Sequence, residues 1–210
     1  MSTRSAILLL VLTSLCVAAE HKLFNGKNLD GWEIVGDGFW AVRSDGVLVG
    51  QGDSKAGRPQ HQSWLYTREE FEEFDLKAEF WLRRGANSGI SIRDTSRARY
   101  AQGAEWDSKK TPSHIGYEIQ LINSDKPQKH DSGSLYLFQP APKKAMKPDD
   151  WNVIEIESRK DRIRIRLNGE LMADHPGDPA RPTRGPIGLQ LHDKETVIEF
   201  RSITLRTPAR

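Results

Sequence analysis

The stretch GYEIQLIN, residues 116–123, alternates between apolar and polar side chains. Successive residues of a β-strand point to opposite faces, so the apolar residues at 117, 119 and 121 share one face and Glu118 and Gln120 point the other way. This alternation predicts a half-buried strand. It also places a carboxyl group beside an amide on the outward face, which the packing of a core does not require.

The same two-residue period recurs along the chain between clusters of Gly, Pro, Asp and Asn. The segments are 75–82, 89–93, 117–122, 152–158, 162–167, 187–192 and 197–205. Residues 158–161 and the dipeptide Asn168-Gly169 are typical of hairpin turns. No segment keeps a helical period, and Thr67–Phe74 would form only a short turn of helix. The pattern predicts an all-β sandwich of two antiparallel sheets.

The first residues have the pattern of an export signal rather than of a folded domain. Arg4 precedes an apolar run, and Val17-Ala18-Ala19 forms a small-residue cleavage site. The apolar run is shorter than the roughly 20 residues that a membrane anchor needs. We therefore expect a signal peptide over 1–19, one domain over 20–210, and a secreted or periplasmic protein with no membrane segment after cleavage. Cys16 leaves with the signal peptide, so the domain has no disulfide.

The charge pattern gives little support to nucleic-acid binding. The 210 residues include 31 basic and 29 acidic side chains, which gives a net charge of +2. The one dense basic stretch, Arg162–Gly169, alternates Arg with Ile and Leu, as a strand with one solvated face does. Two long polar segments, 94–115 and 138–150, are expected to be loops, and the sequence leaves open whether they are binding elements or linker-like disordered segments.

Three of the predicted strands carry unusual polar outward faces. If these strands are neighbours, their polar side chains form one patch that suits a sugar, since amide, guanidinium and carboxylate groups bind vicinal hydroxyls. An aromatic ring among Trp40, Trp81, Trp106 and Tyr136 could stack on a pyranose. The alternative is an ion pair between Glu118 and Arg93 on a solvated sheet. The candidate patch consists of Arg93, Glu118, Gln120, Gln190 and His192, and Asn87 shares the outward face of the segment that contains Arg93.

The motifs argue against several catalytic classes. No Gly-x-Ser-x-Gly, HExxH or P-loop pattern occurs in the sequence. Laminarinase-like sandwich glycosidases carry E-x-D-x-x-E on the catalytic strand, whereas this strand reads E-I-Q-L-I-N from Glu118 to Asn123. A retaining glycosidase needs two carboxyl groups about 5 Å apart. Glu118 alone suits proton transfer better.

His192 is a second candidate for proton transfer, because a neighbouring carboxylate would tune its titration near neutral pH. Glu118 and His192 could also contribute to a metal site, but the spacing identifies no third ligand. We therefore predict no cofactor and no metal ligands, and leave a metal ion open.

A series of motifs in order resembles the 3-keto-disaccharide hydrolase family, long catalogued as a domain of unknown function. The motifs are LFNGKNLDGWE (23–33), FWAVRSDGVLVG (39–50), GANSGISIR (85–93), GYEIQ (116–120), GSLY (133–136), WNVIEIE (151–157), LNGEL (167–171), GPIGLQLHD (185–193) and VIEFRSITL (197–205). The resemblance implies a concanavalin A-like jelly-roll sandwich in an exported protein. It also implies an enzyme that cleaves glycosides oxidised to a ketone at carbon 3, with a small-molecule carbohydrate as its partner.

This chemistry matches the patch. A ketone at carbon 3 acidifies the proton at carbon 2, so a base can remove that proton and expel the glycosidic oxygen from carbon 1. Addition of water then gives net hydrolysis. We assign Glu118 and His192 as base and acid in either order, and Arg93 and Gln120 to the enolate or ketone. The residues that would hold the sugar are Asn87, Tyr136 and Gln190.

Two other readings remain open on the sequence. The same sandwich serves lectins, so the domain could be a non-catalytic carbohydrate-binding module. It could also be an interaction module of the laminin type, which would bind no sugar.

Overall fold

The computed structural model describes residues 20–53 and 62–208. The expected signal peptide, residues 1–19, lies outside the described residues. In the described ranges, no helix has the length and apolar character required to cross a membrane.

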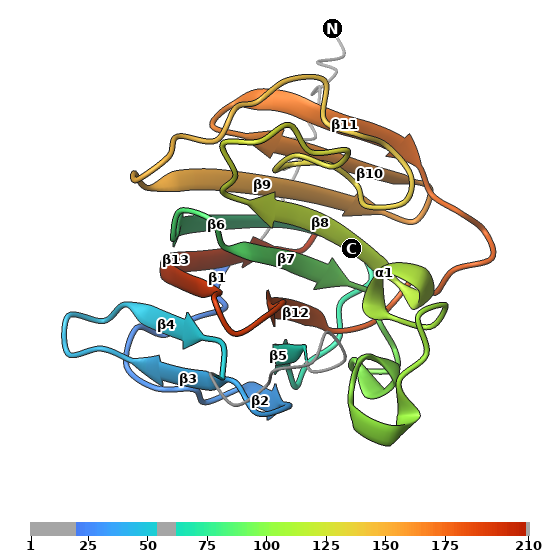
Figure 1. The fold of residues 1–210 in the computed structure, drawn as a ribbon. Helices are drawn as coiled ribbons and strands as arrows, with labels where there is room; N and C mark the ends of the chain where they lie inside the picture. The colour runs from blue at the N-terminus through green and yellow to red at the C-terminus, as the bar shows by residue number, and fades with distance from the viewer. Residues whose placement is uncertain (1–19, 54–61, 209–210) are drawn as a thin grey trace, which may run out of the picture.

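Two antiparallel sheets form the domain (Figure 1), as the two-residue period predicts. Within the described ranges, the larger sheet has the order β11-β10-β9-β6-β13-β4-β3, with β1 paired to β13. Its strands are β1 Glu20–Lys22, β3 Phe39–Val42, β4 Leu48–Gln51, β6 Phe74–Leu82, β9 Asn152–Arg159, β10 Arg162–Leu167, β11 Glu170–Pro176 and β13 Val197–Arg206. The smaller sheet has the order β2-β5-β12-β7-β8. Its strands are β2 Trp32–Val35, β5 Ser63–Thr67, β7 Asn87–Ile92, β8 Tyr117–Ile122 and β12 Ile187–Leu191. The predicted jelly-roll sandwich is confirmed.

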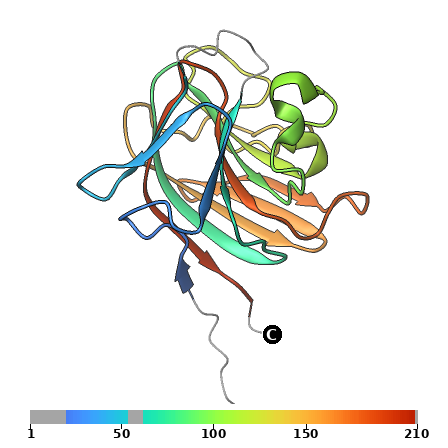
Figure 2. The same cartoon turned by 90° about the horizontal axis from the view of Figure 1, so that it is seen from below.

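The core lies between the two sheets and is built from the inward residues of each strand. Tyr117, Ile119 and Leu121 of β8 are fully buried there, together with Ile154 and Ile156 of β9. Burial of apolar surface contributes about 25 cal/mol per Å², so alternate residues of each strand hold the layers together. Figure 2 shows β1 and the end of β13 side by side, at the register Glu20 to Arg206.

Both predicted hairpins are present. Strands β9 and β10 pair through the turn at Lys160-Asp161, and β10 and β11 pair through Asn168-Gly169. Asn168 and Gly169 both have positive φ, 52° and 83°. Two successive residues with positive φ are the requirement of the turn that joins twisted antiparallel strands most directly.

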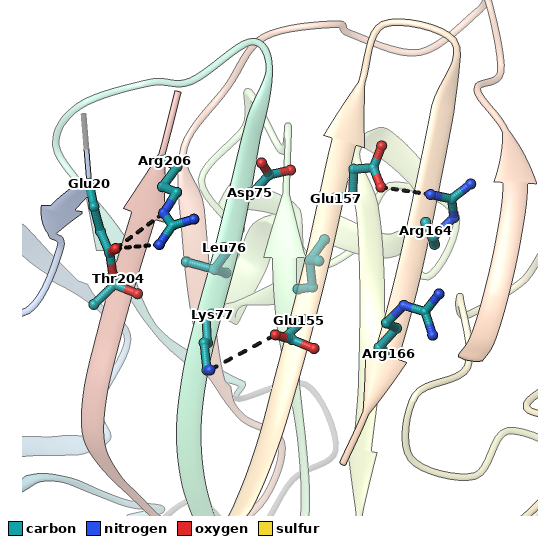
Figure 3. A pocket seen from close by; sticks show the side chains of 11 residues that line it. Glu20, Asp75, Leu76, Lys77, Glu155, Glu157, Arg164, Arg166, Thr204 and Arg206 are labelled. Carbon is teal, nitrogen blue, oxygen red and sulfur yellow. Dashed lines mark hydrogen bonds and ion pairs between the residues drawn. The ribbon is translucent and has the colours of Figure 1, made fainter. Parts of the chain in front are cut away.

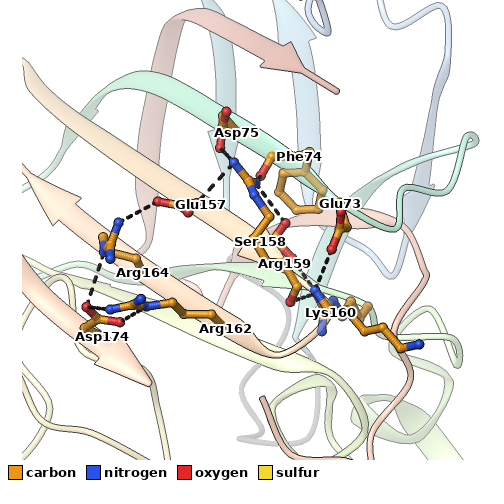
Figure 4. Close-up of polar contacts among 11 residues, drawn as sticks. Glu73, Phe74, Asp75, Glu157, Ser158, Arg159, Lys160, Arg162, Arg164 and Asp174 are labelled. Atoms are coloured by element: carbon orange, nitrogen blue, oxygen red, sulfur yellow. Dashed lines mark hydrogen bonds and ion pairs between the residues drawn. The ribbon is translucent and has the colours of Figure 1, made fainter. Parts of the chain in front are cut away.

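The basic strand β10 has one buried and one solvated face, as predicted. Ile163 and Ile165 enter the core, while Arg162 and Arg164, which alternate with them, face outward into ion pairs (Figure 4). Arg162 Nε lies 2.6 Å from Asp174 Oδ1, and Arg164 Nη1 lies 2.9 Å from Glu157 Oε2. A cavity of about 430 Å³ on this face is lined largely by such paired charges (Figure 3). Exposed pairs of this kind contribute little free energy, and we assign this face no function.

The connections differ in detail from the prediction. Segment 94–115 is a long connection, but it contains the short helical turns η1 Arg99–Ala101, η2 Gly103–Glu105 and α1 Pro112–Ile115. The short helix considered for Thr67–Phe74 is absent from this described segment. Instead, Phe71 exchanges backbone hydrogen bonds with Gly185, which occupy the Phe71 N–H and carbonyl that a helix would use.

Candidate functional site

A polar cavity lies on the outer face of the smaller sheet, where β8, β7 and β12 are neighbours (Figure 1). Its volume is about 190 Å³. Segment 94–115 and the chain before β5 complete its walls. The lining residues are Gln62, Asn87, Trp106, Ser108, Thr111, Ser113, His114, Glu118, Gln120, Tyr136, Gln190 and His192.

The structure brings together six of the seven residues singled out from the sequence. Asn87 comes from β7, Glu118 and Gln120 come from β8, and Gln190 comes from β12. His192 follows β12 directly. The sixth, Tyr136, lies in a turn that is attached to β8, because the Tyr136 N–H donates to the Glu118 carbonyl at 2.9 Å. The roles proposed for these residues stay predictions.

Glu118 is the only carboxyl group among the described residues that line the cavity. Its side chain is buried, with 7% of the residue exposed. Burial raises the pKa of Glu118 to about 7, although the nearby His192 and polar contacts with Gln190 and Ser113 oppose this rise. The charge of Asp94 adds to it. A carboxyl group with this pKa exchanges protons readily at neutral pH.

The sheet leaves room for Glu118 because its neighbour on β7 is a glycine. Gly89 pairs with Gln120 on β8, on the cavity face. A Cβ atom at Gly89 would lie 2.8 Å from Glu118 Oε1 and 3.2 Å from Gln190 Oε1. Any other residue at this position therefore displaces the carboxyl group.

Replacement of Gly89 by alanine is expected to lower activity about tenfold or more while leaving the protein folded. The added methyl group meets the flexible end of Glu118 rather than backbone, so the carboxyl group moves, and small misplacement of a reacting group costs up to about 100-fold. Kinetics and thermal melting of the variant measure both effects. Full activity in a folded Gly89→Ala protein would contradict this placement of Glu118.

Neutral amides surround the carboxyl group. Gln120 Nε2 donates to Asn87 Oδ1 at 2.6 Å, and Gln190 Nε2 donates to Gln62 Oε1 at 3.3 Å. Gln190 Oε1 is buried without a hydrogen-bond partner among the described residues. A buried polar atom without a partner is costly, and a ligand hydroxyl in the cavity would satisfy it.

Two histidines line the cavity, one of which the sequence did not suggest. His192 Nδ1 lies 3.2 Å from Asp193 Oδ2, and the side chain is 39% exposed. His114, on α1, lies with Nδ1 2.7 Å from Thr111 Oγ1. Burial and the charge of Arg181 lower the pKa of His114, which favours its neutral ring.

The wall formed by segment 94–115 is fixed at both ends. At its start, buried Asp94 accepts hydrogen bonds from the Tyr66 hydroxyl at 2.6 Å and from the Ala98 N–H at 2.8 Å. At its end, Arg181 donates to the carbonyl groups of Ser113 and Gly116. The wall therefore holds its position relative to the sheet.

Two of the four aromatic candidates for stacking lie at the cavity. Trp106, which is 39% exposed, and Tyr136 both line it. Trp40 belongs to the core instead, and Trp81 lies on β6 in the larger sheet. An exposed indole at the rim suits the apolar face of a sugar ring.

The expectation that Arg93 joins the polar patch is wrong. Arg93 follows the last residue of β7 and has a φ of 61°, so the alternation of the strand ends before it. Its Nη2 donates to Ser158 Oγ at 2.8 Å and to the Arg159 carbonyl at 2.6 Å, both in the larger sheet. Arg93 thus connects the two sheets, and the suggested ion pair with Glu118 is also absent.

Sequence reasoning missed several lining residues, namely Gln62, Ser108, Thr111, Ser113 and His114. Gln62 could have been predicted from the strand pattern, because alternate residues share a face and Gln62 therefore points the same way as Trp64 and Tyr66. The others lie in segment 94–115, which has no period. In the described ranges, no three or more His, Cys, Asp and Glu side chains are grouped so as to hold a metal ion.

The sandwich and its polar sheet face define a class, the jelly-roll fold of concanavalin A-like lectins and glucanases. The chain belongs to the family with a 3-keto-alpha-glucoside-1,2-lyase-like domain, whose model matches residues 20–206. Membership of this family supports a carbohydrate-active function. No functionally curated protein matches the chain.

Solved structures share the fold at low sequence identity. A candidate glycosyl hydrolase from Parabacteroides distasonis is 22% identical, with a TM-score of 0.68 over 89% of this chain and 93% of that chain. A β-glucanase from Bacillus licheniformis is 9% identical, with a TM-score of 0.57 over 91% and 98%. A carbohydrate-binding module, CBM66, from Bacillus subtilis is 15% identical, with a TM-score of 0.51 over 84% and 96%. At these identities the likeness concerns the fold alone.

Proposed function

We propose that the protein cleaves glycosides that carry a ketone at carbon 3 of the sugar ring. The observation that carries this proposal is the single buried carboxyl group, Glu118, with a pKa of about 7 among neutral amides. Hydrolysis through a glycosyl-enzyme needs a second carboxyl group about 5 Å away, which the described lining does not offer. Elimination needs only a proton acceptor and a proton donor.

The reaction begins with proton removal beside the ketone. A base takes the carbon-2 proton, the electrons of that C–H bond form the carbon 1–carbon 2 double bond, and the glycosidic oxygen leaves carbon 1 with a proton from the acid. The products are an unsaturated keto sugar and the free aglycone. Addition of one water across the double bond converts this elimination into net hydrolysis.

The residues divide into proton transfer and binding. Glu118 and His192 exchange the protons, and the geometry leaves their order open. Gln120 Nε2 donates to Asn87 Oδ1, which leaves the Asn87 amide nitrogen as the donor that we propose for the ketone or enolate oxygen, a role assigned from the sequence to Arg93 and Gln120. Gln190 Oε1 accepts from a ring hydroxyl, and Tyr136 and Trp106 contact the ring. We propose that the reaction takes place after export, on the basis of the sequence of residues 1–19.

Incubation of the protein with a 3-keto-disaccharide and with its unoxidised parent tests this function. Mass spectrometry is expected to show cleavage of the keto sugar alone, because only the ketone acidifies the carbon-2 proton. The same spectra separate elimination from hydrolysis, whose products differ by one water. A panel of intact keto sugars, one of which raises the melting temperature, would make the cavity a binding site and end the enzymatic proposal.

A further inference from the structure

Helix α1 and the residue before it place three polar side chains at the wall of the Glu118 cavity. These side chains are Thr111, Ser113 and His114, and all three line the cavity together with Glu118. The helix leads directly into β8 (Figure 1), so the three residues and Glu118 belong to one short stretch of the chain. The proposed reaction gives none of the three a role.

The three side chains form a continuous chain of hydrogen bonds that ends at the carboxyl group. Thr111 Oγ1 lies 2.7 Å from His114 Nδ1 and 2.9 Å from Ser113 Oγ. Ser113 in turn makes a side-chain hydrogen bond with Glu118. Two hydroxyl groups therefore connect the buried carboxyl group to a ring nitrogen of the histidine.

The local fold keeps this chain of hydrogen bonds in place. Thr111 directly precedes α1, a position where a threonine hydroxyl ordinarily accepts from the helix backbone. In this described segment it makes no such bond, and the hydroxyl contacts Ser113 and His114 instead. Ser113 is 3% exposed, and its carbonyl accepts from Arg181 at 2.7 Å. This bond fixes the helix at the middle of the chain of hydrogen bonds.

The charge of Glu118 sets the direction of every bond in the chain when the His114 ring is neutral, because a hydroxyl group has one proton to donate. When Glu118 is a carboxylate, Ser113 donates to it and Thr111 donates to Ser113. The Nδ1–H of His114 then donates to Thr111. When Glu118 is protonated, it donates to Ser113 and each bond reverses. His114 Nδ1 then accepts from Thr111, and the ring proton lies on Nε2.

We propose that Ser113 and Thr111 relay protons between Glu118 and His114, and that His114 Nε2 is the end of the relay that exchanges with water. A proton that binds at Nε2 displaces the Nδ1 proton to Thr111, whose own proton passes to Ser113. The Ser113 proton then reaches Glu118, so one proton enters and one arrives. His114 is only partly buried, whereas Glu118 is buried. A relay of this kind would return Glu118 to its starting charge after each transfer, and this use rests on the proposed function.

Other titratable and charged groups face the two ends of the relay. Those near Glu118 are His192 after β12, Asp94 after β7, Tyr66 on β5 and, in the cavity lining, Tyr136. Those near His114 are Arg181 and Asp107. These groups influence the titration of the two ends through their charge or their own bonds. A substitution that breaks the chain of hydroxyl groups at Thr111 leaves all of them in place.

The tautomer of His114 tests the relay without any substrate. Nitrogen-15 NMR of the protein distinguishes Nδ1–H from Nε2–H, with the signals of this ring assigned from a His114→Gln sample. Protonation of the ring itself places protons on both nitrogens and gives a third pattern. The proton of the neutral ring is expected to move from Nε2 to Nδ1 as the pH rises through the pKa of Glu118, about 7.

Three variants show whether this change passes through the hydroxyl groups. Thr111→Val keeps the shape of the side chain without its hydroxyl, and Glu118→Gln removes the titrating group without touching α1. Both are expected to abolish the change of tautomer near pH 7. Thr111→Ser retains the hydroxyl, is expected to preserve the change, and is the matched control.

A tautomer that stays constant in the unaltered protein would overturn the relay. So would a change that persists with the same midpoint in Thr111→Val or in Glu118→Gln. Neither result bears on the proposed function, because the cleavage of a keto sugar is measured separately. Conversely, a protein that leaves every keto sugar intact but shows the expected change of tautomer would retain the relay and lose the proposed function.

Discussion

Replacement of Glu118 by glutamine is expected to lower the turnover of a 3-keto-glycoside by about 10²- to 10⁴-fold, the usual contribution of a positioned acid or base. Glutamine keeps the shape of the side chain and its contacts with the floor of the cavity. The variant therefore still folds and binds substrate, and the loss falls mainly on kcat. Steady-state kinetics of the two proteins measure it.

The pH dependence of kcat/KM shows whether Glu118 acts as the base or as the acid. With Glu118 as the base, activity rises through a pKa near 7, and with Glu118 as the acid it falls there. This limb of the profile is expected to disappear in Glu118→Gln. Glu72→Gln, on an exposed position of the same chain, serves as the control and should leave the profile unchanged. Full turnover by Glu118→Gln would remove Glu118 from the mechanism.

The stability of the protein is expected to fall as pH rises from about 4.5 to about 7, because of the same carboxyl group. The pKa of Glu118 is about 7 in the folded protein against a model value of 4.5. Below 4.5 the group is neutral in both states and burial costs nothing. Between these values the folded state binds more protons than the unfolded state, so the free energy of unfolding declines. Above 7 the full cost remains, about 3 kcal/mol at 1.36 kcal/mol per pKa unit.

The difference between Glu118→Gln and the unaltered protein isolates this effect from other titrating groups. The two free energies of unfolding should coincide near pH 4.5 and separate to the full extent above pH 7, with the glutamine variant more stable. Denaturant titrations at pH 4.5, 6 and 8 measure the separation. A constant difference across this range would show that Glu118 titrates at the same pH in both states.

The alternation of apolar and polar residues was sufficient to predict the fold and the residues on the floor of the cavity. Alternation over residues 117–122 already separates the core residues of β8 from Glu118 and Gln120. Because neighbouring strands of one sheet share an outward face, the same reasoning placed Asn87, Gln190 and His192 beside them. This argument holds only while the backbone stays extended.

The failures of prediction occur where the backbone leaves the strand. Arg93 lies one residue past β7 with positive φ, and this single dihedral angle sends its side chain to the other sheet. His114 and Ser113 reach the cavity through α1, which is tied to the distant Arg181 by hydrogen bonds to the Ser113 and Gly116 carbonyls. Long-range contacts of this kind leave no periodic signal in the sequence.

Segment 94–115 is held at both of its ends, and this has a consequence for how new specificities could evolve. Asp94 and Arg181 act as clamps at its two ends, while Glu118 and its amides belong to the sheet. Substitutions between the clamps can therefore reshape the cavity wall without moving Glu118 and its amides. On the proposed function, a library diversified over residues 102–110, with both clamps retained, would explore different aglycones while the proposed proton-transfer groups stay in place.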